Sequence, residues 1–332
     1  MNMHKIKKYY ALGSAFVRTN CLGNRVLSTL MLYITSRCNS RCKICNIWEQ
    51  ENIDLSPDVV AKVLESKAID KKLTHIGIEG GEFLLHPQCK EIFNLLKEFD
   101  VGVISNGLLK KKLLDVVEEF NIKKVSISLD GRPQSYKRVR GLPAYEKVVD
   151  TILSLKGKTE QLGVIYTQNP WNTHEDFEHV KKFCKQHNIN FGFGIYINRN
   201  LFDSSITPED ITYGEQVYRN SESEFAYFYD KWLKKEVILP CLSIRQLAVI
   251  WPNGDVPLCQ GAGLILGNVH KKNFDEIWSC EKSITLQKDY TICNRCWVTF
   301  HREFDLGFFK IATRFLPRKL LESFYGEIKF SK

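Results

Sequence analysis

Six short apolar segments, each followed by a stretch with helical periodicity, constrain the fold of this chain more than any other feature. The apolar segments are rich in β-branched residues and have the length of buried strands; they occupy residues 30–35, 74–79, 101–105, 124–129, 162–167 and 190–196. Helical patterns occupy residues 56–68, 89–99, 108–120, 142–156 and 174–187. This alternation predicts an α/β fold with a parallel sheet, whose ligands gather at the carboxyl ends of the strands.

The composition is that of a soluble globular protein. The chain has 332 residues, of which 44% are hydrophobic and 26% charged, enough for one large α/β domain and a smaller appended unit. We find no run of eighteen apolar residues and no secretory signal pattern, so we expect a cytoplasmic protein. In a reducing cytosol, its eleven cysteines indicate metal or redox chemistry rather than disulfides.

The net charge of +9 is concentrated at the two ends of the sequence. Residues 1–30 hold five Lys/Arg and no acid, and residues 301–332 hold seven Lys/Arg and four acids. We therefore expect no nucleic-acid partner, which would require a basic surface across the fold. Residues 306–325 form a helix-like segment with a break at Pro317. Its apolar stripe consists of Phe308, Phe309, Ala312, Phe315, Leu316, Leu320, Leu321 and Phe324.

These basic, apolar ends have two interpretations. In the first, terminal helices dock on the barrel and expose solvated basic faces. In the second, they attach the protein to the inner face of an anionic membrane, as interfacial helices do.

Three cysteines, Cys38, Cys42 and Cys45, follow the first predicted strand directly. Structural zinc has four ligands, whereas three thiolates suit a [4Fe–4S] cluster with one iron left open to another molecule. The alternatives are a zinc site completed by a distant histidine, and reduced cysteines packed as small apolar residues.

Four further cysteines, Cys241, Cys259, Cys293 and Cys296, can form a complete ligand set. They bracket residues 248–259, which we predict as two short strands around a turn at residues 252–255. A zinc ribbon is the alternative to an iron–sulfur cluster. The other cysteines have no partner by spacing: we expect Cys89 and Cys184 in the core and assign no role to Cys21 and Cys280.

The order of the motifs resembles that of radical S-adenosylmethionine (SAM) enzymes. After the Cys-x3-Cys-x2-Cys triplet, Gly80-Gly81-Glu82 follows the second strand and Ser105-Asn106-Gly107 follows the third. The fourth strand ends in SISLDG, and Arg140-Gly141 comes after it. Two positions depart from the family pattern: Phe83 replaces a proline, and Ile44 replaces an aromatic residue.

The resemblance implies a partial (β/α)6, TIM-like barrel over residues 28–205 and a [4Fe–4S] cluster that binds SAM. In such enzymes the GGE backbone holds the methionyl amino group, a serine at the end of the fourth strand contacts the ribose or carboxylate, and an arginine twelve residues later pairs with the SAM carboxylate. The implied SAM contacts are Gly80, Gly81, Glu82, Ser105, Asn106, Ser128, Asp130 and Arg140.

The spacing Cys241-x12-Gly254-x4-Cys259 resembles the SPASM and twitch extensions of the same family. Because no cysteine follows Cys296, the resemblance implies one fully ligated auxiliary [4Fe–4S] cluster of the twitch type, used for electron transfer. We place this domain at residues 206–300, between the barrel and a basic amphipathic segment at 301–332; residues 1–27 form a basic N-terminal segment. A flavodoxin or ferredoxin is the expected electron donor.

The substrate is less constrained than the cofactors, because a fold does not determine it. The basic apolar ends favour a lipid, a lipid-linked sugar or another small molecule. The alternatives are a maturase that modifies a ribosomal peptide and a zinc or iron–sulfur binding protein without catalytic activity. Polar residues near later strand ends are candidates to face the substrate, namely Gln168, Asn172, Tyr196 and Asn198.

Overall fold

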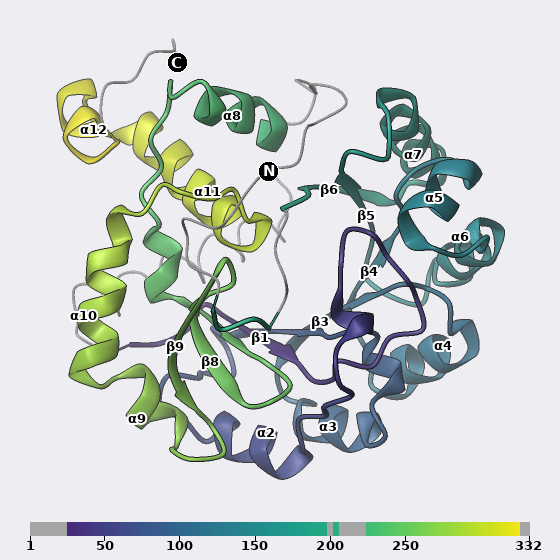
Figure 1. The fold of residues 1–332 in the computed structure, drawn as a ribbon, viewed down its shortest axis with the longest axis horizontal. Helices are drawn as coiled ribbons and strands as arrows, with labels where there is room; N and C mark the ends of the chain where they lie inside the picture. Colours follow the sequence, from purple (N-terminus) through teal and green to yellow (C-terminus); the bar gives the residue numbers. More distant parts are fainter. Residues whose placement is uncertain (1–24, 198–201, 206–223, 326–332) are drawn as a thin grey trace.

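The computed structural model describes residues 25–197, 202–205 and 224–325. Seven parallel strands form a curled half-barrel in the order β6-β5-β4-β3-β2-β1-β7 (Figure 1). The six predicted strands are confirmed, with bounds that differ from the prediction by one or two residues. They are β1 (Thr29–Tyr33), β2 (His75–Glu79), β3 (Asp100–Ser105), β4 (Lys124–Ser128), β5 (Gln161–Gln168) and β6 (Asn190–Ile195).

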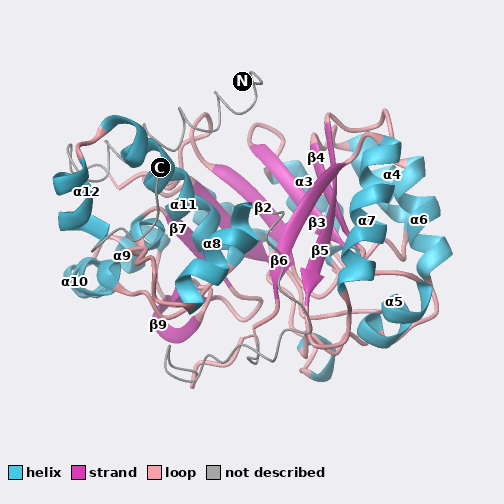
Figure 2. Cartoon of the chain, turned by 90° about the horizontal axis from the view of Figure 1, so that it is seen from above, coloured by secondary structure: helices cyan, strands magenta, loops and turns pink. Residues whose placement is uncertain are grey.

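Helices alternate with these strands, and α4 to α7 lie together on one side of the sheet (Figure 2). Ser56 caps α2, because its hydroxyl accepts the N–H of Val59 at 3.4 Å. The helix α5 was not predicted. The helices of this part are α2 (Pro57–Leu64), α3 (Cys89–Leu95), α4 (Lys110–Glu119), α5 (Pro133–Arg140), α6 (Tyr145–Ser154) and α7 (His174–His187).

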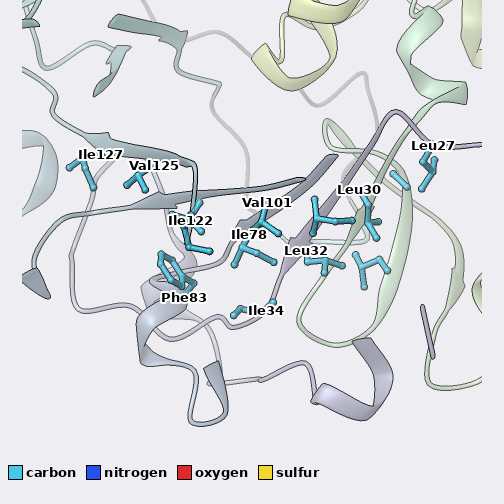
Figure 3. Packing of buried hydrophobic residues seen from close by; sticks show 14 of the residues in the cluster. Leu27, Leu30, Leu32, Ile34, Ile78, Phe83, Val101, Ile122, Val125 and Ile127 are labelled. Atoms are coloured by element: carbon cyan, nitrogen blue, oxygen red, sulfur yellow. The ribbon is translucent and has the colours of Figure 1, made fainter. Parts of the chain in front are cut away.

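The main core lies between the sheet and these helices. Leu30, Leu32 and Ile78, at alternate positions of β1 and β2, are fully buried, and Figure 3 shows them packed near Phe83. Phe83, where the family has proline, thus fills the core below the loop that follows β2. Because side chains alternate along a strand, this packing fixes which residues face the interior of the half-barrel.

The interior face carries small residues. Gly77, Gly102, Gly163 and Gly192, one from each of four strands, line a cavity of about 1010 Å³. Closed barrels hold bulky branched side chains at such positions, which fill the interior. Here the glycines leave the half-barrel hollow, with a volume typical of the largest small-molecule sites.

The C-terminal part adds a strand to the barrel and a small second sheet. The predicted turn at residues 252–255 is present, and Gly254 has a φ of 82°. The two strands around it join different sheets: β7 (Leu247–Ile250) pairs parallel with β1, and β8 (Asp255–Cys259) pairs antiparallel with β9 (Ala262–Asn268). The helices are α8 (Glu224–Leu233), α9 (Phe274–Trp278), α10 (Glu281–Asp289), α11 (Thr299–Phe315) and α12 (Arg318–Tyr325).

The predicted break at Pro317 is confirmed, since it separates α11 from α12. Along the apolar stripe, Phe309 (1% exposed) and Leu321 (0%) are buried, whereas Phe315 is 72% exposed. The side chain of Phe324 and the predicted N-terminal segment up to residue 24 lie outside the described residues. The described helices include none with the length and apolarity needed to span a membrane. The predicted domain boundary at residues 300/301 falls within α11.

Candidate functional site

The three-cysteine loop, residues 35–46, lies between the carboxyl end of β1 and the last turn of α5. The N–H of Arg41 donates to the carbonyl oxygen of Arg140 at 3.2 Å. Gly141, which ends α5 with a left-handed φ of 75°, permits this contact, because a Cβ atom there would lie 2.5 Å from the carbonyl oxygen of Arg41. The loop is therefore fixed at both ends, by β1 and by α5.

The loop after β2 packs against the cysteine loop with no room for side chains. A Cβ atom on Gly81 would lie 2.3 Å from the carbonyl oxygen of Arg37, and one on Gly80 would lie 2.5 Å from that of Thr35. Two backbone hydrogen bonds close the contact: Gly81 N–H donates to Thr35 (2.8 Å), and Glu82 N–H donates to Arg37 (2.7 Å). The glycines thus hold the two loops in register.

Glu82 connects the end of β2 to the end of β3. Its carboxylate, 1% exposed, accepts hydrogen bonds from the Ser105 hydroxyl (3.0 Å) and the Asn106 N–H (2.9 Å). Burial raises the pKa of Glu82 to about 7, although both hydrogen bonds favour the ionised form. Glu82 and Ser105 therefore direct their polar atoms toward each other and join two neighbouring loops.

Two side chains from other elements donate toward the cysteine sulfurs. The Asn106 amide lies 3.9 Å from Sγ of Cys38, and Nη1 of Arg140 lies 3.6 Å from Sγ of Cys42. The same Asn106 amide donates to Oδ1 of Asn39 at 2.7 Å. Such donors favour anionic sulfur over the neutral thiol, as a metal-binding site requires.

Asp130, directly after β4, holds Arg140 in place. The carboxylate is 0% exposed; it accepts the Arg140 Nε–H at 2.5 Å and the Thr167 N–H at 2.7 Å. Burial alone would lower the pKa of Arg140, but the charges of Asp130 and Cys42 raise it above its ordinary value. A charged guanidinium is therefore fixed beside the cysteine loop, by the ends of β4 and β5.

Cys42 is buried, and Cys38 and Cys45 are partly buried. Burial raises the pKa of Cys38, and it raises the pKa of Cys45 to about 12, so both stay protonated at neutral pH until metal binds. In the described part of the chain, no three His, Cys, Asp or Glu side chains are grouped tightly enough to hold one metal ion.

The other predicted residues take different positions. Ser128, the half-buried last residue of β4, pairs in register with Ile165 of β5. Asn172 shapes its own loop, because its amide donates to the Thr167 carbonyl at 2.8 Å and its Oδ1 accepts the N–H of Asn169 at 3.0 Å. Gln168 is 3% exposed at the end of β5, the ring of Tyr196 lies 5.7 Å from that of Trp171, and Asn198 lies outside the described residues.

The second cysteine set is gathered at the start of the small C-terminal unit. Burial raises the pKa of Cys241 well above its usual range, and the nearby charges of Cys296 and Cys259 add to that rise. Cys293 also has a raised pKa, from burial and from the charge of Cys296. The Cys241 N–H donates to the carbonyl of Thr291 at 2.7 Å. The four thiols thus lie in one neighbourhood, although they are 55 residues apart in sequence, from 241 to 296.

A buried ion pair that was not predicted lies beside this set. Arg302, 1% exposed, donates from Nε to the carbonyl of Cys296 (2.8 Å) and from Nη1 to the carbonyl of Leu239 (2.6 Å) and to Asp305 (3.2 Å). Asp305 accepts the N–H of Ser243 at 3.0 Å. Opposite charges three residues apart on a helix, soon after a Cys-x2-Cys motif, are the signal that could have revealed the pair.

His301 links the same unit to the interior of the barrel. Its Nδ1 lies 3.0 Å from the Ser243 hydroxyl, and its Nε2 accepts the N–H of Gln260, the neighbour of Cys259, at 3.1 Å. The Gln260 side chain donates to the hydroxyl of Tyr33, the last residue of β1, at 2.6 Å. A hydrogen-bonded path therefore runs from the second cysteine set to the barrel.

The remaining described cysteines lie away from both sets. Cys89 (8% exposed) and Cys184 (1%) are part of the core, as predicted. The thiol of Cys280 lies 3.3 Å from the hydroxyl of Ser283. Cys21 lies outside the described residues.

Two family models match separate parts of the chain. The radical SAM superfamily matches residues 32–184, and an iron–sulfur cluster-binding domain, SPASM, matches residues 241–297. The first range contains the three-cysteine loop and the loops after β2 to β5. The second range begins at Cys241 and ends one residue after Cys296.

Similar proteins of known activity include enzymes and a cofactor-modifying protein. The GTP 3′,8-cyclase of Aliarcobacter butzleri is 26% identical over 171 residues, 48% of this chain and 53% of that protein. The tungsten-containing aldehyde ferredoxin oxidoreductase cofactor-modifying protein of Pyrococcus furiosus is 26% identical over 317 residues, 80% of this chain and 86% of that protein. This chain spans about half the length, or less, of its GTP 3′,8-cyclase relatives.

Solved structures share the fold. Streptococcus suis SuiB bound to S-adenosylmethionine superposes with a TM-score of 0.60 at 14% identity, over 79% of this chain and 68% of that chain. The enzyme anSMEcpe with bound AdoMet and a peptide superposes with a TM-score of 0.55 at 16% identity, over 86% and 96%. Two family models match the two cysteine-bearing parts of the chain, in the same order along the sequence. This chain therefore belongs to the radical SAM superfamily and carries a SPASM-type iron–sulfur cluster-binding domain.

Proposed function

We propose that this protein cleaves SAM reductively at a [4Fe–4S] cluster held by Cys38, Cys42 and Cys45, with the fourth iron left to SAM. The observation that carries this proposal is the convergence on one loop of two donors, Asn106 and Arg140, from the ends of β3 and α5. When bound, the cofactor supplies a 5′-deoxyadenosyl radical that abstracts hydrogen from a substrate. The protein supplies orientation and the exclusion of water.

Two groups of residues hold SAM in this proposal. The N–H groups of Gly81 and Glu82 already donate to the cysteine loop, so the carbonyl oxygens of Gly80 and Gly81 are the groups offered to the methionyl amino group. Glu82 and Ser105 act as positioning residues, since their side chains bond to each other.

The carboxylate of SAM pairs with Arg140, whose guanidinium Asp130 holds at the edge of the cluster site. Asn106 lies near the ribose and methionyl part. Ser128 offers a half-buried hydroxyl at the end of β4 to the ribose or the carboxylate.

The second cysteine set holds one auxiliary [4Fe–4S] cluster in this proposal, as in twitch-type domains. Cys241, Cys259, Cys293 and Cys296 supply four thiolates, so no iron is left for substrate. A fully ligated cluster transfers electrons, and the hydrogen-bonded path through His301 and Gln260 brings it near the barrel interior. A flavodoxin or ferredoxin supplies the first electron.

For the substrate we propose a lipid, a lipid-linked sugar or another small molecule. The hollow interior of the barrel has the volume for such a molecule. On α11 and α12, the exposed apolar side chains of Ile311, Phe315 and Leu320 lie among the exposed Arg314 and Lys319. This is the composition of a surface that binds anionic lipid, and it supports our proposal that the enzyme acts at the inner face of a membrane.

Modification of a ribosomal peptide is the second candidate. It is favoured by the shared fold of SuiB, which has been solved with its precursor peptide SuiA, with a TM-score of 0.59. Deuterium transfer separates the candidates: reduced enzyme with SAM is incubated with deuterated lipid extract or with deuterated peptide. Deuterium in 5′-deoxyadenosine from the lipid pool alone supports the first proposal, and deuterium from the peptide pool alone contradicts it.

The cofactor proposal has its own test. The reduced, anaerobic protein should give an electron paramagnetic resonance (EPR) signal that changes when SAM is added, and Arg140→Met should weaken the SAM dependence while iron content stays the same. A colourless protein loaded with zinc, or an EPR signal indifferent to SAM, would contradict the proposal.

A further inference from the structure

We propose that Arg302 sets the reduction potential of the auxiliary cluster by donating a hydrogen bond from Nη2 to a cluster sulfur. This inference rests on the auxiliary cluster proposed above. It assigns a positioning and tuning role to a residue that is neither a cluster ligand nor part of the SAM site.

The guanidinium of Arg302 is fixed from three sides. Nε donates to the carbonyl of Cys296 (2.8 Å), and Nη1 donates to Leu239 (2.6 Å) and to Asp305 (3.2 Å). The ring of Trp297 lies 5.9 Å from the guanidinium carbon. These contacts leave the planar group with one orientation.

Nη2 of Arg302 differs from Nε and Nη1, which both donate hydrogen bonds. It is buried and has no hydrogen-bond partner among the described residues, although the whole side chain is only 1% exposed. A buried donor without an acceptor costs about 1–3 kcal/mol, and more when the group is charged. An acceptor that binds later would remove this cost, and an anionic acceptor would form the strongest hydrogen bond with the guanidinium.

The chemistry of the surroundings identifies that acceptor. Nε of Arg302 binds the carbonyl of Cys296, and the charges of Cys241, Cys296 and Cys293 act on the guanidinium, so Arg302 lies beside the cysteine set. An iron–sulfur cluster on four thiolates carries net negative charge and presents sulfur acceptors. Hydrogen bonds to sulfur and local charge are among the determinants of cluster potential.

Asp305 makes the arrangement stable before the cluster binds. It balances the buried charge of Arg302 and is itself anchored by the N–H of Ser243 at 3.0 Å. Because Asp305 binds Nη1 rather than Nη2, it leaves the second nitrogen for the cluster. One-electron reduction adds negative charge to the cluster, so the guanidinium stabilises the reduced form more than the oxidised form.

The test is a redox titration of the holoprotein, followed by EPR, for wild type, Arg302→Met and Arg302→Lys. We expect Arg302→Met to keep about eight irons per chain and to lower the equilibrium constant for reduction of the auxiliary cluster at least ten-fold, which equals about 59 mV for one electron. Arg302→Lys keeps the charge without the planar fork and should lie between the two. Arg295→Met is the matched control: this arginine lies between Cys293 and Cys296 but is exposed, so solvent screens its charge.

Each outcome of the titration either supports or overturns a stated part of the proposal. An unchanged potential in Arg302→Met with full iron content overturns the proposal, as does an equal shift in Arg295→Met. If Arg302→Met loses about four irons, the iron content of Arg302→Lys decides the reason. A restored iron content in Arg302→Lys supports an electrostatic role, whereas an iron content that stays low shows a purely structural role and overturns the proposal. A wild-type protein with about four irons and a single EPR signal would instead refute the auxiliary cluster itself.

Discussion

Replacing Gly81 with alanine should separate the cysteine loop from the loop after β2. The added Cβ atom would lie 2.3 Å from the carbonyl oxygen of Arg37, whereas ordinary contacts begin at 3.4 Å. The two loops must therefore move apart by about 1 Å, the difference between these distances. That movement stretches the Gly81–Thr35 and Glu82–Arg37 hydrogen bonds, each worth about 1 kcal/mol.

The effect on activity should exceed the effect on stability. A misplacement of about 1 Å in a reacting group can cost about 100-fold in rate, whereas the loss of these two backbone hydrogen bonds lowers the unfolding free energy by only about 2 kcal/mol. The assay is the rate of 5′-deoxyadenosine release from SAM by the reduced protein, measured together with iron content and urea denaturation.

Gly192→Ala is the matched control for this experiment. Gly192 lies in β6 of the barrel, and a Cβ atom there meets its nearest neighbour, in Ile165, at 3.5 Å, an ordinary contact. We expect it to cleave SAM at nearly the wild-type rate. If Gly81→Ala with full iron content cleaves SAM as fast as Gly192→Ala, the close packing of the two loops does not position SAM.

Three further variants test other contacts. Burial raises the pKa of Glu82 from 4.5 to about 7, so the unfolding free energy of the wild type should fall as the pH rises through this range. Glu82→Gln should remove up to about 3 kcal/mol of that fall. If wild type and variant lose the same stability between pH 5 and pH 8 in urea denaturation, this expectation is contradicted. Asp130→Asn removes the buried partner of Arg140 and should cost about 3 kcal/mol of stability and about ten-fold in SAM affinity; equilibrium dialysis with wild-type affinity would count against the positioning role. Phe315→Ser/Leu320→Ser should leave the melting temperature unchanged, because both side chains are exposed, and should reduce co-sedimentation with acidic vesicles at low salt; equal sedimentation would argue against the membrane surface.

The repeating part of the fold could be predicted because its signals are local. Each strand from β1 to β6 has an apolar or alternating pattern within a few residues, and the cysteine triplet, the GGE motif, Ser105-Asn106 and Asp130 each come soon after the end of one of them. Parallel strands bring their carboxyl ends to one edge, so the order of the motifs along the chain was enough to predict that Cys42, Asn106 and Arg140 lie together.

What the sequence did not reveal depends on contacts between distant segments. The turn at Gly254 indicated a hairpin, but β7 pairs instead with β1, more than 200 residues earlier. The parallel partner leaves no local signal. Arg302 and Asp305 were assigned to a basic terminal segment, because their charges look solvated until packing of α11 buries both. The Asp130–Arg140 ion pair was not predicted either, because both residues were assigned to SAM contacts and no local signal pairs them.

The most direct test of the account is the yield of 5′-deoxyadenosine from SAM after one-electron reduction of the anaerobic protein. The wild type should be brown and should release 5′-deoxyadenosine, whereas Cys38→Ala/Cys42→Ala/Cys45→Ala should retain the auxiliary iron and release none. Release that persists in the triple variant, or none from a wild type with full iron content, would contradict the assignment of the three-cysteine loop as the site of SAM cleavage.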